Sequence, residues 1–100
     1  MNLKNEFEPI REWAQDKGIL TSGDAKTQSM KLMEESGELA KAILTNDRPE
    51  IIDAIGDCVV VLTNLAALEG LKIEDCINEA YNVIAKRTGK MQDGNFVKDK

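Results

Sequence analysis

The sequence contains no histidine, and this absence removes much of the usual chemistry of small enzymes. Without histidine the chain can build neither a His-containing zinc site nor a Ser-His or Cys-His nucleophilic pair. The two cysteines, Cys58 and Cys76, lack metal-ligand spacing and lie in helical patterns. We therefore interpret both as small buried hydrophobic residues of a protein from a reducing compartment.

Long apolar runs are also missing. The longest run, residues 58–62, is far shorter than the roughly 20 residues that a membrane helix needs. The first ten residues, MNLKNEFEPI, are polar and contain Pro9, so they lack the apolar centre of a signal peptide. The sequence therefore predicts a cytoplasmic protein with no membrane partner.

Basic residues are outnumbered by acidic ones, which gives a net charge of -5 and a pI near 4.7. This balance argues against a nucleic-acid partner, because phosphate grooves need clustered Lys and Arg. Only four of the 100 residues are aromatic, and 42% are hydrophobic. A mainly aliphatic core of this size predicts a single all-α domain over residues 1–100, often completed by a second copy.

Four segments have a helical period. The first places Phe7, Ile10, Trp13 and Ala14 on one face, with Pro9 in the first turn or at a kink. Asp24 or Ser22 caps the second, which ends near residue 44. The third runs over residues 49–69 up to Gly70, and the fourth over residues 73–87. The expected protomer is an antiparallel four-helix bundle with an extended or frayed polar tail at about residues 90–100.

The stretch KLMEESGELAKAI, residues 31–43, holds the most informative acidic residues. Glu34, Glu35 and Glu38 occupy one arc of the second helix, and Glu35 lies nearest its apolar edge. Taken alone, this arc is typical of a solvated acidic face.

The third helix favours a different interpretation. After Asp57 it is apolar almost all the way round, which predicts a buried helix, and Asp53, Asp57 and Asn64 form one narrow stripe through it. A carboxylate on a buried helix is costly unless it is paired, hydrogen-bonded or bound to a cation. Asp57 therefore needs a partner.

The turn TNDRP makes the second and third helices antiparallel neighbours, so that Glu35, Glu38, Asp53 and Asp57 converge. Four carboxylates at close range repel one another, and the chain offers too few Lys and Arg residues to neutralise them. Mg²⁺, or Mn²⁺ in its place, prefers oxygen ligands and also binds substrate phosphates. The expected chemistry is metal-assisted hydrolysis of a polyphosphate by an activated water.

KLMEESGELAKAI followed by EIIDAIGDCVVVL resembles the MazG-like nucleotide pyrophosphohydrolases, members of the all-α NTP pyrophosphatase superfamily. The resemblance extends from EWAQDKGI to NVIAKRTGKMQDGNFVK. It implies hydrolysis of a nucleoside triphosphate to the monophosphate and pyrophosphate, by a homodimer or homotetramer whose paired helices form the nucleotide pocket. The preferred base and sugar stay open.

The family motif EExxE corresponds to Glu34, Glu35 and Glu38, of which the resemblance implies that Glu35 and Glu38 bind metal. The second motif, typically EELGD, reads DAIGD here, so Asp53 and Asp57 match its first and last acids while Ala54 replaces the second. The resemblance thus implies Mg²⁺ held by Glu35, Glu38, Asp53 and Asp57. Glu34 either holds a second metal or orients a water, or forms an exposed salt bridge with Lys31 or Lys41.

Five further residues are candidates for substrate binding, each with a plain structural alternative. Lys31, Lys86 and Arg87 would meet phosphate oxygens, although basic residues at a helix C-terminus also complement the helix dipole. Trp13 would stack on a base or belong to the core. Asn64 would contact the sugar or base, or fix helix register.

A competing interpretation is a non-catalytic helical oligomer whose acidic stripe serves partner binding or regulation. Its support is Ala54, because a degenerate motif can survive in a protein that has lost its chemistry.

Overall fold

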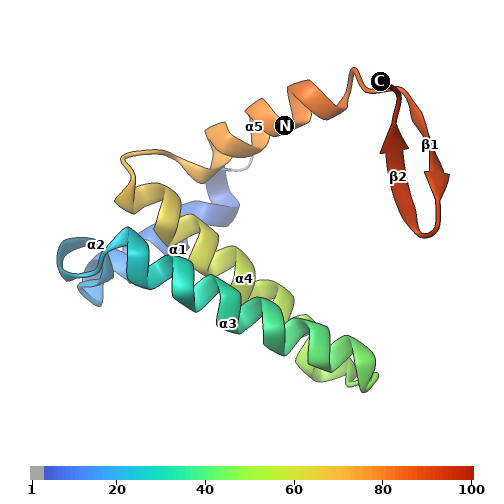
Figure 1. The fold of residues 1–100 in the computed structure, drawn as a ribbon. Coiled ribbons are helices and arrows are strands. Elements are labelled where there is room, and N and C mark those ends of the chain that lie inside the picture. The colour runs from blue at the N-terminus through green and yellow to red at the C-terminus, as the bar shows by residue number, and fades with distance from the viewer. Residues whose placement is uncertain (1–3) are drawn as a thin grey trace.

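The computed structural model describes the backbone of residues 4–100 and the side chains from Glu6 onward. It is helical except for one hairpin at the C-terminal end, as expected of an all-α protein (Figure 1). The elements are α1 (Lys4–Asp16), α2 (Ile19–Ser22), α3 (Ala25–Leu44), α4 (Arg48–Leu68), α5 (Ile73–Ile84), β1 (Gly89–Gln92) and β2 (Asn95–Lys98).

The long helices α3 and α4 form an antiparallel pair, which is the most extensive contact between elements. Asp24 caps α3 by accepting a 2.8 Å hydrogen bond from the Thr27 amide, and Asp47 caps α4. Between the helices Asn46 has a positive φ of 54°, which lets the chain reverse within a few residues. The predicted cap Asp24, the end of α3 at Leu44 and the turn before Pro49 are confirmed.

The helices α1, α2 and α5 each contact α4, and Figure 1 shows them at the end of the helix pair where α3 begins and α4 ends. The Arg11 guanidinium in α1 donates to both carboxylate oxygens of Glu74 in α5 at 2.5 Å, and to Glu8 at 2.9 Å. This forked ion pair joins residues 63 positions apart, with side-chain exposures of 14% and 12%. It fixes the start of α5 against α1.

Three predictions about where elements begin and end were wrong. The segment after α1 was expected to be a plain break and contains the short helix α2. The tail at residues 90–100 is an antiparallel hairpin, with Met91 opposite Phe96. Asp93 and Gly94 both have positive φ, the two-residue turn that suits strand twist, so the chain reverses there instead of fraying. The fourth helix ends at Ile84 rather than at residue 87.

The core of the single chain is thin. Its buried hydrophobic residues are Phe7, Ala14, Ala42, Ala54, Val61 and Ala66. The expectation of a fully buried third helix is wrong for one copy, because one side of α4 exposes Ile52, Ile55, Val59 and Leu62. Cys58 and Cys76 are free thiols and only partly buried.

By length and composition alone, α4 would also be able to cross a membrane. It carries Asp53, Asp57 and Asn64, and it packs against four other helices. Core helices of soluble proteins pass the same test of length and composition.

Candidate metal and nucleotide site

The contact between α3 and α4 buries a carboxylate. Glu35 is 7% exposed, and its Oε2 atom has no hydrogen-bond partner. Glu35 and Asp57 each lie eleven residues from Asn46, so the antiparallel turn brings them level. An ionised oxygen that is buried without a donor costs free energy, which makes Glu35 the clearest candidate for a cation ligand.

Asp57 lies within the electrostatic reach of Glu35. Its pKa is raised, first because burial disfavours the ionised form and then because the negative charges of Asp53 and Glu35 are close. Asp53 lies one turn before Asp57 on the same side of α4. The two helices therefore place at least three carboxylates in one electrostatic group.

Glu38 joins this group from α3. Its pKa is also raised, chiefly by the negative charge of Glu35, with smaller effects of burial and of the charges of Glu34 and Glu50. Lowering the local negative charge, as a bound cation would do, relieves this repulsion at Glu38 and at Asp57.

Lys31 is the cation that the chain itself supplies. Its Nζ lies 3.4 Å from Oε1 of Glu35, one turn away on α3. Its positive charge also offsets part of the rise in the pKa of Asp57. Glu34 is exposed and lines a surface hollow beside Lys31. The structure thus pairs Lys31 with Glu35, whereas the sequence left a pairing of Lys31 with Glu34 open.

The donor set suits a hard divalent cation, because it consists of carboxylate oxygens, one of them buried and unpaired. Among the described side chains, no three acidic or cysteine groups lie close enough to form a complete metal site. Side-chain rotations that bring Glu38 and Asp57 toward Oε2 of Glu35 are therefore needed to enclose an ion.

Trp13 lies beside the acidic group instead of in the core. It is 47% exposed and lines a hollow of about 370 Å³ together with Asp57, Pro9, Ile10 and Val60. The exposed indole face is available for stacking on a base.

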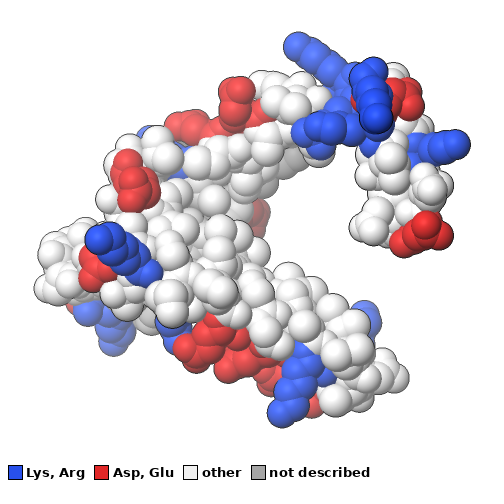
Figure 2. All heavy atoms as spheres, viewed as in Figure 1, with Lys and Arg blue, Asp and Glu red and all other residues white. Residues whose placement is uncertain are grey.

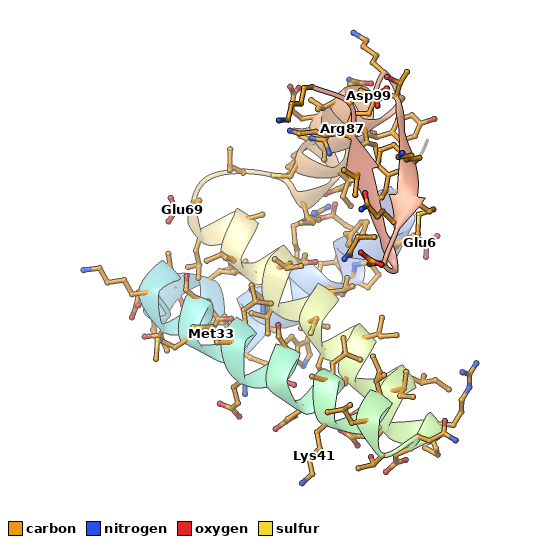
Figure 3. The ribbon with its side chains drawn as sticks, turned by 45° about the vertical axis from the view of Figure 1, so that its right-hand side comes forward. Glu6, Met33, Lys41, Glu69, Arg87 and Asp99 are labelled. Atoms are coloured by element: carbon orange, nitrogen blue, oxygen red, sulfur yellow. The ribbon has the colours of Figure 1, made fainter. Side chains whose placement is uncertain are left out.

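The remaining sequence candidates do not meet in one chain. Asn64 is 3% exposed, and its Oδ1 has no hydrogen-bond partner, so it lies inside the helix layer. Lys86 and Arg87 are exposed and follow α5, which does not contact α3. Figure 3 shows Arg87 far from the α3 residues Met33 and Lys41.

Glu50 is the acidic residue that the sequence analysis missed. It shares a hollow of about 300 Å³ with Glu38, Lys41, Ala42, Thr45 and Asp47, and its charge acts on Glu38. Glu50 and Ala42 are equally far from Asn46, so the same antiparallel argument would have placed Glu50 one turn from Glu38.

Comparisons with known proteins agree with this geometry. Residues 24–91 match the model of the MazG nucleotide pyrophosphohydrolase domain, a span that includes both acidic motifs. The chain is 38% identical over 65 residues to an uncharacterized 18.2 kDa protein encoded in the rep-hol intergenic region of Haemophilus phage HP1 (strain HP1c1). The match covers 65% of this chain and 40% of the phage protein, so the chain spans less than half of that relative.

No solved structure matches the chain. The matched family points to nucleotide pyrophosphohydrolase activity and to an all-α protein. Because the family model covers more than half of the sequence, the chain belongs to the MazG nucleotide pyrophosphohydrolase domain family.

Proposed function

We propose that the protein is a magnesium-dependent hydrolase that cleaves a nucleoside or deoxynucleoside triphosphate to the monophosphate and pyrophosphate. The observation that carries the proposal is the buried, unpaired Oε2 of Glu35 at the level of Asp57. A group of carboxylates of this kind can bind a cation, and without a cation its burial and mutual repulsion cost free energy.

Glu35, Glu38, Asp53 and Asp57 would hold the metal. A bound Mg²⁺ neutralises substrate phosphates and lowers the pKa of a coordinated water. Glu34, an exposed acid that is not among these four ligands, is the candidate to orient the attacking water. The pKa of Glu38 is raised first by the charge of Glu35 and to a smaller extent by the charges of Glu34 and Glu50, and this repulsion is what a bound cation would relieve.

The chain's other residues would bind the substrate. Trp13 stacks on the base in the hollow that Asp57 borders. Lys31, at the edge of the acidic group, contacts a phosphate oxygen in the substrate complex and is held ready by Glu35 in its absence. Mn²⁺ replaces Mg²⁺ in the same oxygen-only site.

Ala54 favours the alternative of a non-catalytic oligomer, because it removes one carboxylate from the helix pair. It is fully buried in α4 and as far from Asn46 as Glu38 is, so an acid there would face Glu38 across the helix pair. Asp53 and Asp57 supply the carboxylates of α4 in its place.

A homodimer or homotetramer completes the core in this proposal. Ile52, Ile55, Val59 and Leu62 on α4 are 36–65% exposed, and a second copy would cover them. In this proposal the protein partner is a second copy of the chain, and the cytoplasmic enzyme binds neither nucleic acid nor a membrane.

The test is pyrophosphate release from each common NTP and dNTP in Mg²⁺, with EDTA as the metal-free control. Release that requires Mg²⁺ supports the proposal. The variant Glu38→Gln should lose activity, whereas Glu12→Gln, an exposed acid of α1, should keep it. Absence of release with every substrate, together with unchanged melting of the protein in Mg²⁺, would favour the non-catalytic alternative.

A further inference from the structure

The C-terminal arm, defined as residues 78–100, is the least packed part of the described chain. Every side chain from Asn78 to Lys100 is exposed, including those of Tyr81, Ile84 and Phe96 at 52–53%. No Cα atom of β1 or β2 comes within 8 Å of a Cα atom of any helix. Figure 1 shows the hairpin projecting from the end of α5, away from α3 and α4.

This isolation conflicts with the sequence of the arm. A single two-stranded hairpin is at best marginally stable in water and needs a surface to cover it. The arm has such an apolar face, because Tyr81, Ile84, Ala85 and Phe96 border one hollow, together with Arg87. Met91 and Phe96 are cross-strand partners and extend that face along the hairpin.

The charge of the arm indicates what covers it. Residues 78–100 contain five basic and three acidic side chains, whereas residues 1–77 contain eight basic and fifteen acidic ones. Figure 2 shows Lys and Arg gathered where α5 passes into the hairpin, and Asp and Glu gathered along the α3–α4 pair. The excess of basic side chains in the arm is therefore complementary to the acidic α3–α4 pair, which the hairpin does not approach in its own chain.

The dimensions also fit. The helical part and the hairpin together extend about 25 Å, from the rise per residue of helix and strand. Two packed helices such as α3 and α4 are about 20 Å wide. The arm is therefore long enough to cross the acidic helix pair of a neighbouring molecule.

We propose that the C-terminal arm of one copy docks across the α3–α4 pair of a second copy, so that each acidic site is built from two chains. In a twofold dimer the exchange is reciprocal, and each copy both gives and receives an arm. Arg87, with Lys86 and Lys90 beside it, then contacts the phosphates of a substrate bound to the second copy. This last step rests on the proposed function, whereas the docking does not.

A subunit-mixing experiment tests the shared site. Arg87→Glu and Glu38→Gln are each expected to be weakly active alone, and random mixing should restore about a quarter of wild-type activity, because half of the dimers carry one intact site. If Arg87 serves the acidic group of its own chain, mixing restores nothing. That result would overturn the shared site.

A cross-linking experiment tests the docking without any reference to activity. Phe96 is replaced by p-benzoylphenylalanine in unlabelled protein, which is mixed with ¹⁵N-labelled wild-type protein and irradiated. Met91 is the second position, on the same face of the hairpin, and Thr21 is the control on α2. The expected products join a light arm peptide to heavy peptides of residues 25–68.

Three outcomes would each overturn the docking. They are cross-links confined to one chain, cross-links to a heavy segment other than α3 or α4, and the absence of cross-links from both arm positions. If the expected cross-links form but the protein releases no pyrophosphate, the docking is supported and the proposed function is rejected.

Discussion

The body of the molecule, residues 1–77, and the C-terminal arm, residues 78–100, differ in both packing and charge. In the body, helix contacts bury small residues and force carboxylates together, as at Glu35 and Asp57. In the arm no side chain is buried, and basic residues outnumber acidic ones. The body thus concentrates negative charge, while the arm carries an excess of basic side chains.

The largest expected effect is on the body. Glu35→Gln keeps the size of the side chain and removes the buried charge, so pyrophosphate release should fall at least about 100-fold. The melting temperature without Mg²⁺ should stay the same or rise, because repulsion from Glu38 and Asp57 is relieved. Differential scanning fluorimetry with and without Mg²⁺ should show a metal-dependent rise in wild type only. An equal Mg²⁺-dependent rise in the melting temperature of the variant would show that Glu35 does not bind the metal.

The ion pair at the junction between body and arm gives the next effect. Glu74→Gln should lower the free energy of unfolding by roughly 1–3 kcal/mol at neutral pH, because it breaks a largely buried, forked pair with Arg11. Glu79→Gln, an exposed change on the same helix, is the matched control. Urea unfolding measures both, and equal values for the two variants would contradict this role of the pair.

The same pair predicts a pH dependence. Hydrogen bonding to Arg11 holds the pKa of Glu74 below its ordinary value of 4.5. A lowered carboxyl pKa contributes stability that is fully present above pH 4.5 and is lost as the pH falls through the folded-state value. The stability difference between wild type and Glu74→Gln should therefore shrink below pH 4.5. A difference that stays constant down to pH 3 would show that the Glu74 charge is not its source.

A charge reversal in the arm should have a smaller effect on activity. Arg87→Glu is expected to raise KM about 10-fold with an unchanged far-UV circular dichroism spectrum, because it removes a phosphate contact and no buried group. Lys72→Glu, an exposed basic residue of the body, is the control. Equal KM values for wild type and Arg87→Glu would show that Arg87 of the arm does not bind the substrate.

The smallest expected effect concerns the hairpin itself. A Cβ atom at Gly89 would lie 2.2 Å from the Val97 carbonyl oxygen and 2.7 Å from Cζ of Phe96, so Gly89→Ala must disturb the pairing of the strands. Because no Cα atom of the hairpin lies within 8 Å of a helix Cα atom in the same chain, the melting temperature should change by no more than about 2 °C. In ¹H–¹⁵N spectra, amides of α1 and α2 should keep their positions. Shifts throughout α1 would contradict the independence of the arm.

Much of the fold follows from local residues that act within a few positions of one another. Asp24, Pro49 and Gly70 mark helix ends because caps and turns depend on neighbouring backbone groups, and these predictions are confirmed. The hairpin was missed although Asp93–Gly94 is a strong turn signal between two short apolar pairs. The Arg11–Glu74 pair was not predictable, because it depends on how helices 63 residues apart pack.

The predicted site divides in the same way. Antiparallel register about Asn46 was enough to bring Glu35 and Asp57 together, since it follows from one short turn. The positions of Lys86 and Arg87 depend on where α5 leaves the body, which helical periodicity does not encode. The apolar pattern of α4 identified a helix that needs covering, but not that one copy leaves a row of it exposed.

The most direct test of the central claim is the identity of the products. Incubation of the protein with dNTPs and Mg²⁺, followed by ³¹P NMR, should show a nucleoside monophosphate and pyrophosphate in equal amounts, whereas in EDTA only the signals of the uncleaved triphosphate should remain. Orthophosphate with a nucleoside diphosphate, or no product from any nucleotide, would contradict the account.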